Sequence, residues 1–361
     1  MSKRALSVAL LLGSVNAACA HGMQAPATPA VLAPDSTLAS LGAPEQVWRA
    51  KAGRRFTGRL VVSGETIYGG SVDRKVYALN LANGEQLWSS RLGGLIAGGV
   101  LVAGDTVLAA SSRPEGRVYA LEARTGRRIW RTTIGPVTAP LALVDSVVVA
   151  ETQRGDIVGL DRRTGAVRWR RRLGPARVPA VPGDSGTLIV ATVDSLFRLS
   201  VRDGRVVGRM RSPGAVVSPW IESRGLLVAG TTDSLVAAVD RDSLRVRWQV
   251  RLDAPVLGSP AAAGDTLFAA SRRGGLFRIV GDSAPTATRI ADLDWPVTSP
   301  VAVVGGLVFV GGADGLLRAL HFDGQEAWHV QLRWPVELAP LALNDGLLAV
   351  GGGGDLHRYR R

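Results

Sequence analysis

A proline recurs at almost constant spacing through most of this chain, and that regularity constrains the fold more than any other feature. Six prolines follow one another at intervals of 39 to 41 residues: Pro140, Pro179, Pro219, Pro260, Pro300 and Pro340. Counting backwards by the same interval places Arg59 and Gly99 in the equivalent position, so the chain contains eight units. An internal period of this length is typical of a β-propeller or a solenoid.

Each unit has the pattern of short strands. Apolar runs such as TIYGGS (66–71) and LVFVGG (307–312) are separated by tight turns such as AAGDT (262–266). Four such runs per unit, with turns about every 8–12 residues and no helical period, are typical of one propeller blade. The sequence therefore predicts an all-β fold: an eight-bladed β-propeller of four-stranded antiparallel blades.

The two ends of the repeat region complement each other. After Pro340 the chain supplies three strand-like runs, LALNDG, LLAVGG and DLHRY, and then stops. Before the first complete unit it supplies a single strand, EQVWRA (45–50). Pairing that N-terminal strand with the last unit would close the ring and hide two sheet edges. We therefore assign residues 45–361 to the propeller.

A tryptophan ends a second recurring motif, in which a polar residue and a TG or DG turn precede it, as in DRRTGAVRW (161–169). Glycine accepts the positive φ that such turns require. Propeller blades diverge with radius, so an indole on the outer strand can fill the wedge between neighbours and donate its N–H to a backbone carbonyl. We expect a structural docking role for Trp48, Trp88, Trp130, Trp169, Trp248 and Trp328; the slots near Gly208 and Ile290 lack the residue.

The N-terminus has the pattern of an export signal. Residues 1–20 combine a basic start, a short apolar run and small residues before the single cysteine, Cys19. A lone cysteine at the signal boundary suggests lipidation, although Asn16 departs from the usual lipobox; ordinary cleavage nearby is the alternative. Residues 21–44 are rich in Ala and Pro and are interpreted as a tether. The predicted location is the periplasmic face of the outer membrane, lipid-anchored, or the soluble periplasm.

The chain is strongly basic, with a formal net charge of +13 that comes almost entirely from arginine. A basic surface can attract nucleic acid, anionic lipid or an acidic protein. No recognisable nucleic-acid motif accompanies the charge, so a nucleic-acid partner is not predicted. A solvated surface is the alternative reading of the same charge.

The segment YALEARTGRRIW (119–130) resembles the repeat of the pyrroloquinoline-quinone dehydrogenase propellers and their non-enzymatic relatives. An exported chain of eight such units is most similar to the B-subunit lipoprotein family of the bacterial outer-membrane β-barrel assembly machinery. The resemblance implies a scaffold that binds assembly components or unfolded clients, as a monomer within a complex. The chain departs from the family at 170–178 and 209–218, where the partner-binding connections have minimal length.

The sequence does not show the residues that catalysis would need. The enzymatic relatives use a quinone, a calcium ion, an Asp base and an adjacent cysteine pair, whereas this chain has one cysteine. His321, His329 and His357 lack metal-ligand spacing. We therefore predict no enzymatic activity, catalytic residue, metal or cofactor. A quinoprotein dehydrogenase, or an exported propeller that binds another protein, a glycan or a small ligand, are the alternatives.

Arginines cluster in equivalent segments of two neighbouring units. The candidate partner-binding residues are Arg124, Arg127, Arg128, Arg162, Arg163, Arg170, Arg171 and Arg172. They should form one basic sector at the rim, either as a solvated edge or as a docking patch for an acidic domain or lipid phosphates.

Two further tryptophans lie outside the docking motif. In the connections between units the residue before an inner proline is small in four units, but it is Trp295 and Trp334 in two adjacent ones. They should lie on one face of the ring. Exposed, they would be a plausible binding hot spot; alternatively they pack on their own loops or close the channel.

Overall fold

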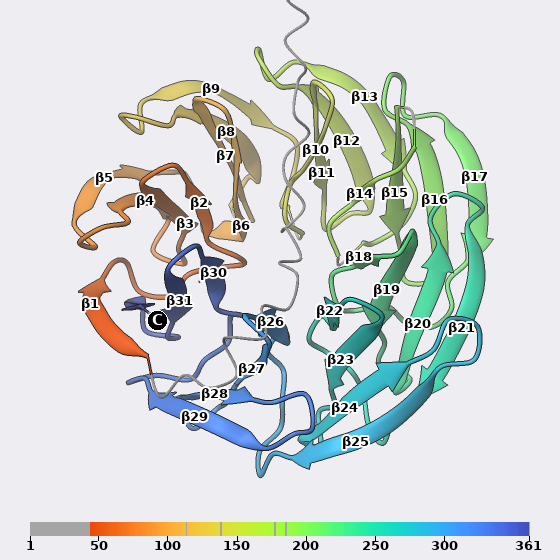
Figure 1. Cartoon of the computed structure of the whole chain (residues 1–361). Helices are drawn as coiled ribbons and strands as arrows, with labels where there is room; N and C mark the ends of the chain where they lie inside the picture. The colour runs from red at the N-terminus through yellow and green to blue at the C-terminus, as the bar shows by residue number, and fades with distance from the viewer. Residues whose placement is uncertain (1–43, 113, 138, 177, 185, 361) are drawn as a thin grey trace, which may run out of the picture.

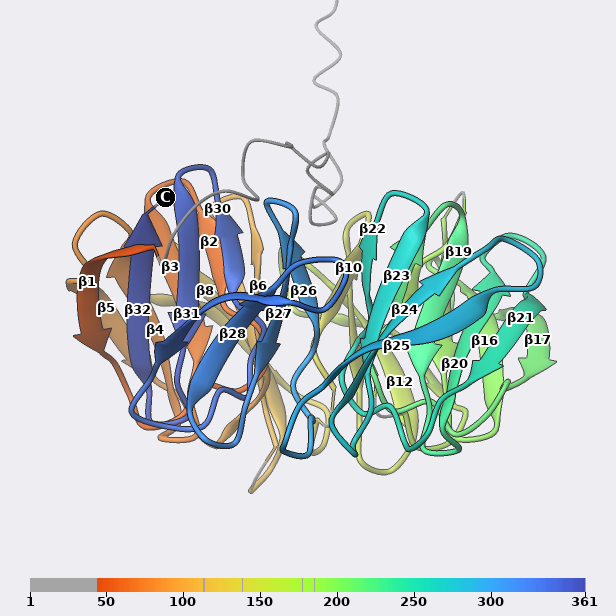
Figure 2. The same cartoon turned by 60° about the horizontal axis from the view of Figure 1, so that its bottom comes forward.

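The computed structural model describes residues 44–112, 114–137, 139–176, 178–184 and 186–360. Cys19 and the predicted signal and tether therefore lie outside the described residues, apart from Pro44. The described chain folds into eight four-stranded sheets that follow one another around a ring (Figure 1). Seen from the side, the sheets stand next to one another as blades (Figure 2). The predicted eight-bladed β-propeller is confirmed.

Blades 1 to 4 use consecutive strands, ordered from the innermost to the outermost. Their bounds are β2 (Val61–Ser63), β3 (Thr66–Gly70), β4 (Lys75–Asn80), β5 (Gln86–Arg91), β6 (Ile96–Ala103), β7 (Thr106–Ser111), β8 (Arg117–Glu122), β9 (Arg128–Thr133), β10 (Ala142–Val144), β11 (Val147–Glu151), β12 (Asp156–Asp161), β13 (Val167–Arg172), β14 (Val181–Pro182), β15 (Thr187–Ala191), β16 (Ser195–Ser200) and β17 (Val206–Arg211).

Blades 5 to 7 repeat this order, and blade 8 combines the two ends of the described chain. The bounds are β18 (Ile221–Ser223), β19 (Leu226–Gly230), β20 (Leu235–Asp240), β21 (Arg245–Arg251), β22 (Ala261–Ala263), β23 (Thr266–Ala270), β24 (Gly275–Val280), β25 (Thr286–Asp292), β26 (Ala302–Val304), β27 (Leu307–Gly311), β28 (Leu316–Leu320), β29 (Glu326–Gln331), β30 (Leu341–Leu343), β31 (Gly346–Val350), β32 (Asp355–Arg360) and β1 (Glu45–Lys51).

The N-terminal strand closes the ring, as the sequence predicts. Strand β1 pairs antiparallel with β32, with Trp48 opposite Arg358. Figure 1 shows this strand, in red, as the outer strand of the blue last blade. The guanidinium of Arg49 donates a 3.2 Å hydrogen bond to the carboxylate of Asp355, which is almost fully buried. The closure therefore joins residues from opposite ends of the chain.

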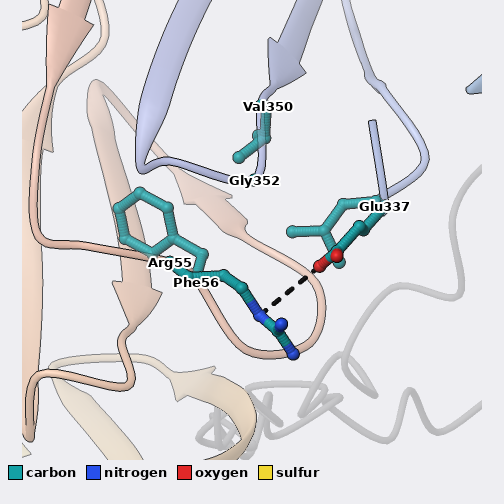
Figure 3. A pocket seen from close by; sticks show the side chains of 7 residues that line it. Arg55, Phe56, Glu337, Val350 and Gly352 are labelled. Atoms are coloured by element: carbon teal, nitrogen blue, oxygen red, sulfur yellow. Dashed lines mark ion pairs between the residues drawn. The ribbon is translucent and has the colours of Figure 1, made fainter. Parts of the chain in front are cut away.

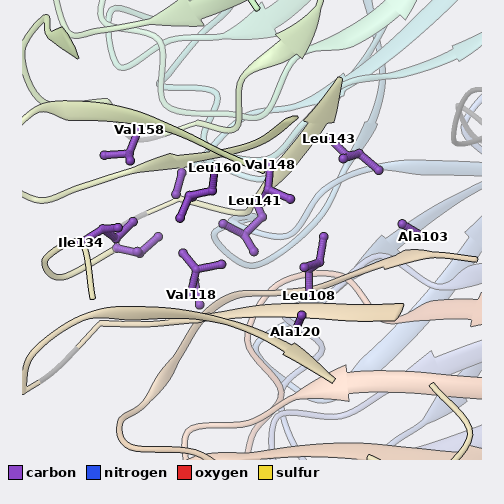
Figure 4. Packing of buried hydrophobic residues seen from close by; sticks show 13 residues of the cluster. Ala103, Leu108, Val118, Ala120, Ile134, Leu141, Leu143, Val148, Val158 and Leu160 are labelled. Carbon is purple, nitrogen blue, oxygen red and sulfur yellow. The ribbon is translucent and has the colours of Figure 1, made fainter. Parts of the chain in front are cut away.

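The hydrophobic core is divided among the contacts between blades. Eight clusters of buried side chains are present among the described residues, and each combines residues of two consecutive blades. Figure 4 shows the cluster between blades 2 and 3, where Leu108 and Val118 face Val148 and Leu160. Strand residues of the middle strands are buried on both sides, which explains their continuous apolar runs. Most of the hydrophobic stabilisation therefore lies between blades.

A β-bulge in the outermost strand directs each motif residue into the wedge. In blade 1, Trp88 pairs with Ala78 while Gln86 pairs with Leu79, so Leu87 is the extra residue. The same shift occurs beside Trp130 in blade 2. A bulge twists the strand and redirects the following side chain. It leaves Leu87 52% exposed while the indole that follows is partly buried.

Candidate interaction surfaces

Four of the motif tryptophans donate the same kind of hydrogen bond to the blade that follows them. The indole N–H of Trp48 donates to the Leu81 carbonyl at 3.0 Å, and that of Trp88 donates to Ala123 at 2.9 Å. The remaining two bonds run from Trp130 to Arg162 at 3.0 Å and from Trp169 to Val201 at 2.7 Å. In each case the acceptor belongs to the turn between the third and fourth strands of the following blade.

The glycine of that turn has a second role that sequence reasoning missed. Gly126 has a φ of 71°, and a Cβ added to it would collide with the Trp88 ring of the preceding blade. Gly204 has a φ of 68° and lies against Trp169 in the same way. The glycine of the TG step in one unit thus packs against the tryptophan of the preceding unit. The nearly constant spacing between this glycine and the tryptophan of the preceding unit is the sequence feature that could have revealed the contact.

The other motif positions close their wedges differently. Trp248 is 6% exposed, but no hydrogen bond from its indole N–H is found within the described part of the chain. Trp328 packs edge-on against Phe309 of its own blade, with ring centroids 5.4 Å apart. Gly208 pairs with Arg198 as Trp88 pairs with Ala78, so it holds the tryptophan position of blade 4. In blade 6 that position is held by Thr288, which pairs with Arg278, and the bulge falls at Ile290.

Trp295 is packed against the blade that follows it. Its ring lies under the guanidinium of Arg318 on β28, 3.7 Å from the ring centroid. Arg318 also pairs with Asp314 at 2.9 Å, and its side chain is 15% exposed. Arg318 occupies the strand position of Tyr77 in blade 1, so Trp295 supplies an aromatic ring where the strand itself carries none. Its role therefore includes intramolecular stacking.

Trp334 lies in the equivalent connection but is 41% exposed. It rests on Gly353, where an added Cβ would collide with the indole. Beside this loop, residues of blades 8 and 1 line a small depression that has no room for a water molecule (Figure 3). Across it the Arg55 guanidinium pairs with the Glu337 carboxylate at 3.4 Å. A glycine-backed aromatic side chain is thus presented to solvent beside an ion pair.

The predicted basic sector lies on the outer strands β9 and β13 and on the turns before them. Some of its arginines already have partners: Arg170 pairs with Asp156 of its own blade at 2.9 Å, and Arg171 donates to the Gly204 carbonyl of the next blade at 3.1 Å. Arg127 pairs with Glu122 at 3.6 Å. A hydrogen bond from the Arg168 guanidinium, together with bonds from Thr164, lowers the pKa of the Asp161 carboxyl to about 2.

The other members of the sector have no such partner. Within the described ranges, no side-chain ion pair or hydrogen bond is found for Arg124, Arg128, Arg162, Arg163 or Arg172. All but the partly buried Arg162 are exposed. Sequence reasoning also missed that the arginines continue onto β17 and β21 of the next two blades. The recurrence of Arg after the tryptophan slot, as in Arg209 and Arg251, is the signal that could have revealed them.

The three C-terminal histidines are separate from one another in the fold. His329 Nδ1 lies 2.6 Å from the Glu326 carboxylate on β29, and His357 Nδ1 lies 3.0 Å from the Gln46 amide oxygen. Burial lowers the pKa of His357, and the nearby Arg49 adds to this effect. No group of three or more metal-ligating side chains is found within the part of the chain that the structure describes. No helix there is long and apolar enough to cross a membrane.

One buried acid was also missed by sequence reasoning. Glu151 ends the apolar strand β11 and is 1% exposed. Burial raises its pKa well above the ordinary value, and a backbone hydrogen bond from Ala180 of the next blade opposes that shift. An acid at the end of the run VVVAE is the feature that identifies it in the sequence.

The repeat geometry defines a class: an eight-bladed propeller built from PQQ-like repeats, with its wedges closed by indoles and apolar side chains. A family model described as "Outer membrane protein assembly factor BamB" matches the chain in overlapping segments, residues 34–180, 114–217 and 153–284. These segments together cover more than half of the sequence, so the chain belongs to the BamB family of PQQ-like propellers. No curated protein sequence matches the chain significantly.

Solved structures share the fold at low sequence identity. BamB from Moraxella catarrhalis has a TM-score of 0.76 at 17% identity, covering 88% of this chain and all of that one. The computationally designed Ika8 protein has a TM-score of 0.74 at 14% identity over 88% and 99% of the two chains. The quinohemoprotein alcohol dehydrogenase ADHIIG from Pseudomonas putida HK5 has a TM-score of 0.65 at 13% identity over 88% and 76%. These likenesses establish the fold and leave the function to the surfaces of this chain.

Proposed function

We propose that this protein is a non-catalytic periplasmic scaffold that binds other components or clients of outer-membrane protein assembly. Membership of the BamB family supports this proposal. The structural observation that carries it is Trp334, which is 41% exposed and the only aromatic side chain among the exposed large hydrophobic residues of the described chain. Exposed, rigidly backed aromatic residues are enriched among the hot spots of protein interfaces.

The surfaces proposed to contact partners are the connection that carries Trp334, with Trp295 in the adjacent blade, and the arginines of the basic sector. Trp334 would contribute contact area, while Trp295 would support the same face through its stack on Arg318. The family membership favours a location at the periplasmic face of the outer membrane, and lipidation of Cys19 would anchor the protein there.

Cross-linking in the native cell envelope, followed by identification of the captured proteins, tests the function. Capture of outer-membrane assembly components is the expected result. If only unrelated proteins or a glycan are captured, the protein is a propeller with another binding role. Absorbance measured after addition of pyrroloquinoline quinone tests the enzymatic alternative, because a bound quinone would contribute its own spectrum.

Substitution of each exposed or stacked tryptophan tests the surface. Trp334→Ala should weaken partner binding by roughly thirtyfold or more, as a hot-spot loss of about 2 kcal/mol implies. Its melting temperature should change little. Trp295→Ala should lower the melting temperature first, because it removes the ring on which Arg318 stacks. A Trp334→Ala variant that melts normally and captures its partners as well as the wild type would refute this surface.

The anchor has a separate test. Cys19→Ala should release the protein from the membrane fraction into the soluble periplasm. A wild-type protein that is already soluble, with a mature N-terminus at His21, would show ordinary cleavage instead.

A further inference from the structure

The outer wall of the ring is electrically asymmetric. The outermost strands of blades 2 to 5, β9, β13, β17 and β21, carry eleven arginines and no acidic residue. We call these four strands the Arg belt; its arginines are Arg128, Arg131, Arg168, Arg170, Arg171, Arg172, Arg209, Arg211, Arg245, Arg247 and Arg251. The outermost strands of the other four blades, β25, β29, β1 and β5, carry four Lys or Arg and three acids.

Much of this charge is available to a partner. Within the described residues, five arginines of the Arg belt make no side-chain ion pair or hydrogen bond: Arg128, Arg131, Arg172, Arg211 and Arg245. All five are exposed. Their guanidinium groups therefore retain the geometry for two parallel hydrogen bonds to a carboxylate.

Exposed apolar residues alternate with the arginines along the same strands. Ile129 is 48% exposed, Val167 46% and Val246 41%. Val206 and Val207 on β17 are 41% and 45% exposed. Most lie next to the bulge that turns the motif residue into the wedge, so the fold holds them outward. The belt thus presents apolar area between fixed positive charges.

Protection of sheet edges does not account for the asymmetry. Charged side chains on an outermost strand prevent edge-to-edge association, and arginine could serve that purpose. All eight blades have such an edge, yet the arginines are concentrated on four consecutive ones. The concentration on one side points to a partner that approaches from that side.

The curvature of the belt favours a flexible partner. Four of the eight blades extend over about half of the ring, and their outer strands form a convex wall (Figure 1). A flat lipid surface would touch only a narrow part of such a wall. An extended polypeptide can follow it from blade to blade.

We propose that the Arg belt binds an extended acidic polypeptide segment, in which Asp or Glu carboxylates pair with the free arginines and apolar side chains contact the exposed valines and Ile129. This inference rests on the proposed scaffold function and names the chemistry of one of its partners. The binding is electrostatically steered, so it weakens as salt is added.

Poly-L-glutamate is the probe, and charge reversal on the two halves of the ring is the test. The belt variant carries Arg128→Glu, Arg131→Glu and Arg211→Glu. The matched control carries Arg54→Glu, Arg91→Glu and Arg272→Glu, which are also exposed and without side-chain partners in the described chain. Both variants lower the formal net charge from +13 by the same amount. The belt variant should bind at least about tenfold more weakly than the wild type, and the control less than about threefold.

Melting temperatures verify that both variants are folded. Equal losses in the two variants would show that only net charge matters and would overturn the proposal. It would also be overturned if wild-type protein bound vesicles containing phosphatidylglycerol through the belt while poly-L-glutamate failed to distinguish the variants.

The test separates this proposal from the scaffold function itself. Trp334→Ala should leave poly-L-glutamate binding unchanged, because Trp334 lies outside the belt. If the belt variant binds poly-L-glutamate normally while Trp334→Ala still loses its envelope partners, the belt proposal fails and the scaffold function stands.

Discussion

Two neighbouring wedges of the ring are closed in opposite ways. Between blades 3 and 4, Trp169 fills the wedge and packs on Gly204 of the next turn. Between blades 4 and 5 the large and small residues are exchanged: Gly208 takes the tryptophan position, and Leu244 takes the glycine position. Leu244 is 7% exposed and belongs to the buried cluster between those blades.

The exchange shows which property of the wedge is required. Leu244 has a φ of 51°, a conformation that costs a branched side chain free energy and that Gly204 adopts easily. A Cβ placed on Gly208 would lie 3.5 Å from Leu244 Cδ1, so the leucine leans into the space that an indole fills elsewhere. Both wedges are therefore filled by a large apolar side chain, but only one of them has the indole hydrogen bond.

The largest expected effect on stability is at the seam, the place in blade 8 where β1 pairs with β32 and the two ends of the described chain meet. Deleting residues through Lys51 removes β1 and Trp48, and by analogy with core tryptophan truncation should cost at least about 3–5 kcal/mol of unfolding free energy. Deleting residues 22–40 should leave the melting temperature nearly unchanged. Equal melting temperatures for the two deletions would show that β1 does not stabilise the ring.

The wedge between blades 4 and 5 can be converted by two substitutions into the tryptophan–glycine form found between blades 3 and 4. Gly208→Trp alone should overpack the wedge and cost about 1–3 kcal/mol, and Leu244→Gly alone should leave a cavity. The double variant should recover most of the loss, with a coupling free energy of about 1–3 kcal/mol measured by chemical denaturation. Additive single effects would contradict the idea that the two residues compensate each other.

The contribution of the indole hydrogen bond can be isolated by phenylalanine. Trp169→Phe replaces the indole by a smaller phenyl ring and removes its hydrogen bond to the Val201 carbonyl. Trp248→Phe removes similar volume from a residue of similar burial, which has no such bond in the described structure. The first variant should lose about 1 kcal/mol more than the second. Equal losses would assign the whole effect to packing.

The smallest effect concerns pH at the seam. Burial and the neighbouring Arg49 lower the pKa of His357 below its ordinary value, while Asp355 opposes the shift. The unfolded chain therefore takes up a proton first as the pH falls. The stability contributed by neutral His357 is present above pH about 6.5 and is lost as the pH falls below it.

His357→Phe is the matched variant, since Phe197 and Phe277 occupy the same strand position in other blades. The melting temperature of the wild type should decrease more between pH 7 and pH 5 than that of the variant. Parallel decreases would assign the pH dependence to other groups.

Much of the architecture was predictable because the repeat encodes it locally. The spacing of Pro140 to Pro340 gave the number of blades, and the unpaired strand at 45–50 gave the closure with β32. The candidate surfaces were predictable only as positions in the chain. The sequence placed Trp295 and Trp334 in equivalent connections, but Trp295 stacks on Arg318 whereas Trp334 rests on Gly353 and remains 41% exposed.

The sequence by itself determined the fold class, the blade boundaries and the outer position of the motif tryptophans, because turns and alternating apolar runs are properties of neighbouring residues. The tertiary structure decided what meets across each wedge: the pairing of Gly208 with Leu244, the stacking of Trp295 and the gathering of arginines on one side of the wall. The contacts of Gly208 with Leu244 and of Trp295 with Arg318 each join one blade, or the connection that leaves it, to the following blade. The relative orientation of the two blades exists only after the ring has closed. The repeat period specifies which residues are equivalent, and packing between blades decides which of the equivalent residues remain exposed to solvent.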